Sequence, residues 1–217
     1  MVVRELQQLL ARIYDTEAAH DVADFLLTDP RLAARLHPAL AARETPETLL
    51  LEQDDEGVRV ALYLDRELLR RLAAAPPFER LDGRNLEDFC TALEGVSHFA
   101  CLTWNAARDR GVSLLGLELQ AEVDKYAASL FVIGAQHRES ATRGLWTQLF
   151  ERFRYAEGLE VAARERYQAA NHYAARFCRH LERDYLSPRR PRIEALLRRL
   201  RWFYRLPDGE KLRCAAA

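Results

Sequence analysis

The sequence lacks the motifs that bind nucleotides or activate a catalytic hydroxyl group. None of the patterns G-x-G-x-x-G, G-x-x-x-x-G-K-S/T and G-x-S-x-G occurs in it, which leaves nucleotide hydrolysis and serine catalysis without support. Cys178 and His180 are two residues apart on a predicted helix, so they point in different directions and do not suggest a nucleophilic pair. We therefore favour a protein that is not an enzyme and expect no cofactor.

Cysteines are few, and no long hydrophobic run is present. Cys90, Cys101, Cys178 and Cys214 form no C-x-x-C pair and have no zinc-type spacing, so we expect reduced thiols in a cytoplasmic protein. The longest nearly uncharged stretch, 126–136, is too short to cross a bilayer. The N-terminal segment mixes charges into its apolar pattern and has no small-residue cleavage site, so we expect neither a secretory signal nor a membrane partner.

Charge of each sign is abundant but unevenly distributed along the 217 residues. Residues 138–217 contain 18 Arg and Lys against 10 Asp and Glu, whereas residues 1–137 contain 14 against 23. Either the two parts neutralise each other within one fold, or the basic part faces an acidic partner. The high content of Arg, Ala and Leu suggests a bacterial source.

The hydrophobic pattern predicts an α+β fold, in which a small antiparallel sheet of about three strands packs against a larger, mostly helical body. Strands are expected at 48–53, 58–65 and 96–104, the first two forming a hairpin. Helices are expected at 2–13, 16–26, 30–37, 66–75, 86–94, 113–134, 141–153, 159–185 and 189–205. We expect an N-terminal α+β part at 1–137 and a basic helical part at 138–217, together forming one compact unit.

Two local signals support individual elements of this prediction. Alternation of apolar and polar residues along 58–64 predicts one buried strand face that includes Leu62 and Leu64. Gly95 is expected to end the helix that follows Asn85, so that the apolar segment 96–104 becomes a strand buried on both faces.

A possible ligand site involves His98 and nearby carboxylates. Glu118 and Glu122 are four residues apart on one helix, so both side chains point the same way and could hold a metal or act as acid and base. The alternative is a solvated flank in which Lys125 pairs with Glu122. An imidazole as buried as that of His98 is expected to have a lowered pKa. If a pocket exists, it is expected at His98, Glu118 and Glu122, with Glu94 beside them.

The other histidines do not indicate a metal site. His172 and His180 are eight residues apart, or about 12 Å along a helix, and His172 lies opposite the apolar stripe. The Glu-x-x-His pattern of carboxylate-bridged di-iron bundles is absent from this helix. We therefore predict no metal ligands.

The C-terminal helix combines arginines with an outward-facing tryptophan. On a helical wheel of 192–205, Ile193, Leu196, Leu197, Leu200, Phe203 and Tyr204 share the inward face. Trp202 projects from the opposite face, and the basic residues around it are Arg198, Arg199, Arg201 and Arg205. Trp and Arg are enriched at the centres of protein interfaces, but the chain's own tail or its acidic part could also cover this face.

Three functions remain open from the sequence. Our leading hypothesis is a non-catalytic protein that contacts a protein partner or itself through the basic, Trp-bearing C-terminal helix. The first alternative is an enzyme, or a small-ligand or metal binder, with a pocket near His98, Glu118 and Glu122. The second alternative is nucleic-acid binding through the basic C-terminal helices, although a pI near 6.6 argues against a dedicated nucleic-acid binder.

Overall fold

The computed structural model describes residues 1–36, 45–54, 57–136, 144–151, 160–187 and 191–216. Its α-helices are α1 (Val2–Tyr14), α2 (Pro30–Leu36), α3 (Arg66–Ala74), α4 (Leu86–Ala106), α5 (Leu114–Ala135), α6 (Val161–Leu181), α7 (Ile193–Arg205) and α8 (Asp208–Ala216). A 3₁₀ turn, η1, spans Val22–Phe25, and π-helical turns span Thr147–Glu151 (η4) and Glu182–Leu186 (η5). The strands are β1 (Leu26–Leu27), β2 (Glu47–Asp54) and β3 (Gly57–Leu64).

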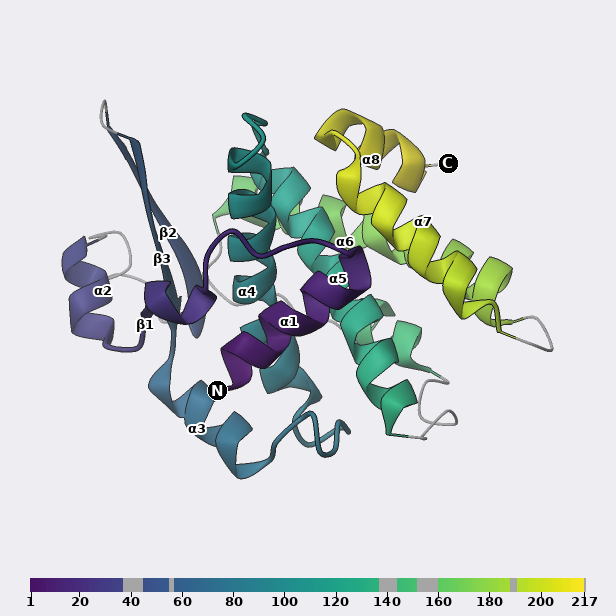
Figure 1. Ribbon diagram of the computed structural model, residues 1–217, viewed down its shortest axis with the longest axis horizontal. Coiled ribbons are helices and arrows are strands. Elements are labelled where there is room, and N and C mark those ends of the chain that lie inside the picture. Colours follow the sequence, from purple (N-terminus) through teal and green to yellow (C-terminus); the bar gives the residue numbers. More distant parts are fainter. Residues whose placement is uncertain (37–44, 55–56, 137–143, 152–159, 188–190, 217) are drawn as a thin grey trace.

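The sheet is small and lies at one end of a helical body, as the predicted α+β class requires (Figure 1). Strands β2 and β3 form the predicted antiparallel hairpin, and the strand order is β1-β3-β2. β1 pairs in parallel with β3, with Leu26 opposite Leu62, so the sheet is mixed. Helices α7 and α8 lie at the other end of the molecule, away from the sheet (Figure 1).

The predicted strand at 96–104 is wrong, because these residues continue α4 to Ala106. Six of the nine residues in this stretch are apolar. A helix that is buried on most sides lacks the periodicity that separates it from a buried strand. Gly95 does not end the helix either. A Cβ atom at Gly95 would lie 2.6 Å from Oε2 of Glu47 and 2.7 Å from Cδ1 of Leu62, so the glycine lets α4 approach the sheet closely.

The predicted helix over 16–26 is also wrong. Asp15 ends α1 with a left-handed backbone (φ 53°), and the chain then runs without regular structure to η1. The side chain of Asp21 accepts a hydrogen bond from the backbone N–H of Ala23 at 2.9 Å, so this acidic residue caps the short turn. The predicted helix at 141–153 lies partly outside the described residues, which show η4 there.

Both faces of the sheet are covered, which explains one departure from the predicted alternation. Leu62 and Leu64 are fully buried in the main core, as predicted. Tyr63 is also buried, because α2 covers the second face of the sheet and forms a small cluster with Ala33, Leu50 and Tyr63. The main core includes side chains from α1, α4, α5, α6 and α7. No helix within the described ranges is both long and apolar enough to cross a membrane.

Candidate functional site

Helix α5 passes through the interior of the protein and packs against both α4 and α6. Nearly every side chain between Gly116 and Ile133 is buried, including six polar or charged ones. These are Glu118, Gln120, Glu122, Asp124, Lys125 and Ser129. Because a buried polar group is costly unless it finds a partner, α5 must be surrounded by compensating groups. The buried charged and amide side chains of α5 and their partners form two separate networks.

The first network, here called the His98 cluster, joins four elements. Its members are Glu47 of β2, Glu94 and His98 of α4, Glu118, Glu122 and Lys125 of α5, and Arg166 of α6. Helical spacing presents the α4 pair and the α5 residues to one another, because side chains four residues apart share a face. The hairpin supplies Glu47 through the close approach that Gly95 permits.

Lys125 is the main buried cation of the cluster. Its Nζ lies 2.6 Å from Oε2 of Glu94 and 2.7 Å from Oε1 of Glu122. The pairing with Glu122 confirms the predicted three-residue spacing, but both side chains are more than nine-tenths buried. The interpretation of a solvated flank is therefore wrong, because α4 covers this side of α5.

His98 lies among three carboxylates. Its Nε2 is 3.4 Å from Oε2 of Glu118, and its Nδ1 is 3.9 Å from Oε1 of Glu47. Burial alone would lower the pKa of His98, but the carboxylates of Glu118, Glu47 and Glu94 outweigh it and raise the pKa to about 9. The sequence-based expectation of a lowered pKa is wrong, because it considered the burial of the imidazole and not the charges of the carboxylates around it.

The carboxylates respond differently to the same surroundings. Burial raises the pKa of Glu47 to about 8 and also raises that of Glu122, despite the nearby Lys125. Burial also acts to raise the pKa of Glu94, but the ammonium group of Lys125 and the charge of His98 more than offset it and lower the pKa. With these pKa values, Glu47 and His98 both hold a proton at neutral pH.

Three residues of the cluster have the composition of a metal site. Glu94, His98 and Glu118 each offer one ligand atom, and these atoms lie within 4.8 Å of one another. Three buried atoms in the cluster, Nε2 of His98, Oε2 of Glu47 and Nε of Arg166, have no hydrogen-bond partner among the described residues. The 3.4 Å separation from Glu118 exceeds the usual 2.7–3.2 Å range of an N–H···O bond, at about the limit of hydrogen bonding.

The site residues proposed from sequence are thus brought together, although by a different element. His98, Glu118 and Glu122 lie in one cluster with Glu94. His98 belongs to helix α4 and not to the strand that was expected at 96–104. Sequence reasoning missed Glu47 and Arg166, since no local pattern connects either residue with α4 or α5. His172 and His180 belong to no ligand group among the described residues.

The second network lies around Asp124 and is closed. Tyr14 donates a short hydrogen bond to Oδ1 of Asp124, Gln120 donates to the same oxygen at 2.7 Å, and Ser97 donates to Oδ2 at 2.6 Å. Lys211 of α8 donates to Oε1 of Gln120 at 2.8 Å. Burial raises the pKa of Asp124 to about 6. Because these side chains satisfy one another, this network anchors α1 and α8 to α5.

In α7, the helix that bears Trp202, the aromatic side chains lie as predicted. Trp202 is 46% exposed, whereas Phe203 and Tyr204 are buried. Ile193, predicted to face inward, is instead 41% exposed, because it begins α7 and lies beyond the body that the later turns contact.

Two arginines of α7 donate hydrogen bonds to backbone carbonyl oxygens of α1 and the residue that follows it. Arg201 donates to the carbonyl oxygen of Ile13 at 3.0 Å, and Arg205 donates to that of Asp15 at 2.9 Å, so both cover the C-terminal end of α1. The guanidinium group of Arg199 lies 4.2 Å from the centre of the Trp202 ring. Arg198 is exposed, so the outward surface consists mainly of Trp202, Arg198 and Arg199.

Comparisons with known protein families, curated proteins and solved structures find no match to this chain.

Proposed function

We propose that the protein binds a first-row divalent metal ion through Glu94, His98 and Glu118. The observation that carries this proposal is the imidazole of His98. Its side chain is only 9% exposed, and its Nε2 lies 3.4 Å from Oε2 of Glu118, too far for a well-formed hydrogen bond. Buried polar atoms in proteins normally have partners, and those without one are frequently functional.

The donor set indicates the class of metal. One imidazole nitrogen and two carboxylate oxygens suit Zn²⁺, Fe²⁺ or Mn²⁺ better than Ca²⁺, which prefers a larger set of oxygen ligands. An ion bonded at about 2.1 Å spans at most about 4.2 Å between two ligand atoms. The three ligand atoms lie within 4.8 Å of one another, so only small rotations of the side chains would bring them to the spacing that a bound ion requires.

Surrounding charges support the same set of ligands. Lys125 contacts one oxygen of Glu94, and a carboxylate has a second oxygen to offer a metal. A bound divalent ion would replace the proton of His98, and Glu47 is placed to accept the ring's Nδ1–H, as carboxylates commonly do for metal-binding imidazoles. Three protein ligands leave positions open for water or another small molecule, as in catalytic zinc sites. The four free thiols are consistent with our inference of a cytoplasmic protein.

Metal analysis of the purified protein tests this proposal. The protein is stripped with EDTA, exposed separately to Zn²⁺, Mn²⁺ and Mg²⁺, passed through a desalting column and analysed by native mass spectrometry. We expect about one Zn²⁺ or Mn²⁺ per chain and no retained Mg²⁺. Binding at neutral pH should release a proton, which calorimetry detects as a heat that depends on the buffer.

Matched variants locate the ion. His98→Gln and Glu118→Gln should each weaken binding by about 100-fold or more. His172→Gln and Glu165→Gln change exposed residues of the same types on α6 and should leave binding unchanged. Failure of the stripped wild-type protein to retain any ion, or equal losses in the control variants, would overturn the proposal.

A second candidate function is a protein contact through α7. We infer it from Trp202, which is 46% exposed and lies beneath the guanidinium group of Arg199. Exposed Trp and Arg side chains provide much of the binding energy at protein interfaces. The acidic surplus of residues 1–137 makes a second copy of the chain a suitable partner.

Sedimentation velocity at several protein concentrations tests self-association. The variant in which Arg198, Arg199 and Trp202 are replaced by Ala should stay folded and sediment as a monomer under conditions where the wild type associates. A wild-type protein that is monomeric throughout would exclude a second copy as the partner.

A further inference from the structure

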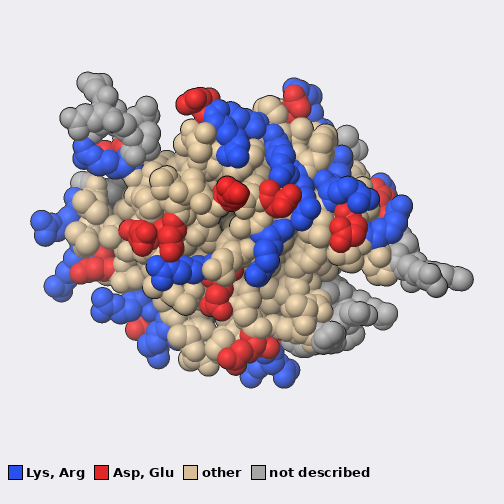
Figure 2. Space-filling model, in the orientation of Figure 1, with Lys and Arg blue, Asp and Glu red and all other residues tan. Residues whose placement is uncertain are grey.

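A separate concavity of about 490 Å³ lies where the ends of three helices meet. Its walls come from the end of α1 and the following loop, the end of α4 and the end of α7. The lining residues are Asp15, Thr16, Glu17, Trp104, Arg108, Arg110 and Arg205. Basic side chains form a band over this part of the surface (Figure 2). The His98 cluster contributes no residue to it.

Three arginines of the concavity are held in place without losing their charge. Arg108 donates to the carbonyl oxygen of Trp104 at 2.9 Å, Arg110 to that of Arg205 at 3.0 Å, and Arg205 to that of Asp15 at 2.9 Å. A carbonyl oxygen orients a guanidinium group but does not neutralise it. Within the described ranges no carboxylate lies at ion-pairing distance from any of the three, whereas Arg71, for example, pairs with Asp88 at 2.7 Å.

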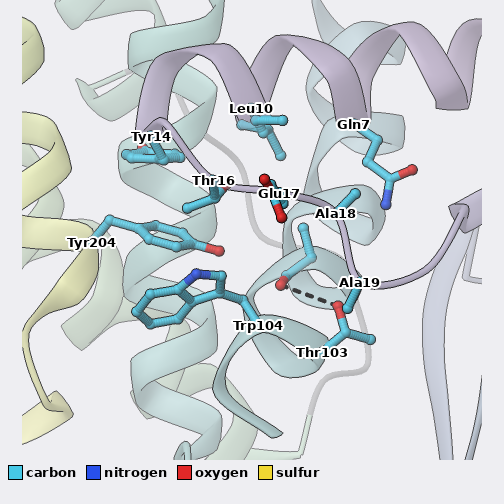
Figure 3. A pocket seen from close by; sticks show the side chains of 12 residues that line it. Gln7, Leu10, Tyr14, Thr16, Glu17, Ala18, Ala19, Thr103, Trp104 and Tyr204 are labelled. Atoms are coloured by element: carbon cyan, nitrogen blue, oxygen red, sulfur yellow. Dashed lines mark hydrogen bonds between the residues drawn. The ribbon is translucent and has the colours of Figure 1, made fainter. Parts of the chain in front are cut away.

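The ring of Trp104 makes this arrangement rigid. The guanidinium carbon of Arg108 lies 4.2 Å from the ring centre and that of Arg110 5.6 Å. On its other side the indole meets Tyr204 edge to face, with ring centres 5.1 Å apart. Beside these two rings is a narrow crevice under the loop that carries Thr16 to Ala19 (Figure 3). Its volume of about 20 Å³ suits a single water molecule, so a ligand must occupy the outer concavity.

We propose that this concavity binds a small phosphate monoester that carries hydroxyl groups, such as a sugar phosphate. Fixed, unneutralised guanidinium groups recognise phosphate oxygens through paired, charge-assisted hydrogen bonds. The carboxylates of Asp15 and Glu17, which line the same concavity, can accept hydrogen bonds from ligand hydroxyl groups. The same two carboxylates would repel the successive phosphates of a nucleic acid, and the volume is within the range of small-molecule sites.

Ribose 5-phosphate is the probe for a direct test. Protein labelled with ¹⁵N is titrated while the indole N–H signal of Trp104 is followed, after its assignment with a Trp104→Phe variant. Ribose, inorganic phosphate and sodium sulfate are titrated at matched ionic strength. We expect a saturable shift of this signal with ribose 5-phosphate, a weaker one with inorganic phosphate and none with ribose.

Variants of the exposed arginine give the second arm of the experiment. Arg108→Gln should weaken binding by about ten-fold or more, because one charge-assisted interaction is lost. Arg108→Lys keeps the charge but not the planar fork, so it should bind with intermediate affinity. Arg198→Gln removes an exposed arginine elsewhere and should bind like the wild type.

Three results would overturn the proposal. The first is an equal shift with sulfate, which would show nonspecific screening of charge. The second is the absence of any shift of the Trp104 signal at millimolar ribose 5-phosphate. The third is tighter binding of a short oligonucleotide with a steep dependence on salt, which would assign the arginines to a nucleic acid.

Discussion

Raising the pH through the neutral range should destabilise the protein, because the folded state holds a proton on His98 that the unfolded state loses. The pKa of this imidazole is raised from an ordinary value of 6.5 to about 9. Its contribution to the free energy of unfolding is therefore fully present below pH 6.5 and is lost as the pH rises through 9. With these two values, the linkage relation gives a loss of about 2 kcal/mol between pH 6.5 and 8.5. The raised pKa of Glu47 acts in the same direction.

Urea unfolding followed by circular dichroism measures this effect at pH 6.5, 7.5 and 8.5, with EDTA present so that no metal replaces the proton. We expect His98→Gln to lose the share of the pH dependence that comes from the imidazole and to keep the share that comes from Glu47, whereas His172→Gln should retain both. The buried thiols do not interfere, because their ordinary pKa of 9.0 lies above this range and burial raises it further. Equal pH dependence in the wild type and His98→Gln would refute the assignment of a proton to this imidazole.

Three further substitutions test the packing that positions these groups, each by urea unfolding against the wild type. Arg205→Ala should cost about 1 kcal/mol, because the C-terminal end of α1 loses a donor, whereas Arg198→Ala should cost little. Lys125→Met should cost about 3–5 kcal/mol, because two buried carboxylates lose their shared cation, and added Zn²⁺ should restore part of this loss if the metal proposal is right. Phe203→Ala should cost about 3–5 kcal/mol and Trp202→Ala less than about 1 kcal/mol, since only the first ring is buried.

Sequence periodicity predicted those elements that keep one polar face. α1, the hairpin and α7 each combine buried and exposed positions, so their patterns revealed both the element and its orientation. Periodicity failed to predict the full length of α4, because this helix is buried on most sides and contains a glycine, a residue that often ends helices. Gly95 is required by close packing against the sheet, and tertiary contacts of this kind leave no local signal.

The candidate site was predicted in part for a related reason. His98 was singled out as a polar residue in apolar surroundings, and this contrast does not depend on whether the segment is a helix or a strand. Glu118 was singled out by its four-residue spacing from Glu122, on a helix that was predicted correctly. The shift in the pKa of His98 was predicted with the wrong sign, because burial alone was considered, whereas the carboxylates of Glu118 and Glu47 outweigh it. The arginine concavity was missed, since it forms only where the ends of three helices meet.

The two polar networks of α5 show why one is a candidate site and the other a structural anchor. Around Asp124 three donors satisfy one carboxylate, and Lys211 completes the set from α8. The His98 cluster contains more charge, yet it leaves buried atoms of His98 and Glu47 without hydrogen bonds among the described residues. Buried ion pairs often stabilise no better than apolar packing, so stability alone gives little reason to assemble so many charges with incomplete pairing. The same helix thus contains a satisfied network for comparison, and the incomplete network contains the donor atoms of the metal site that we propose.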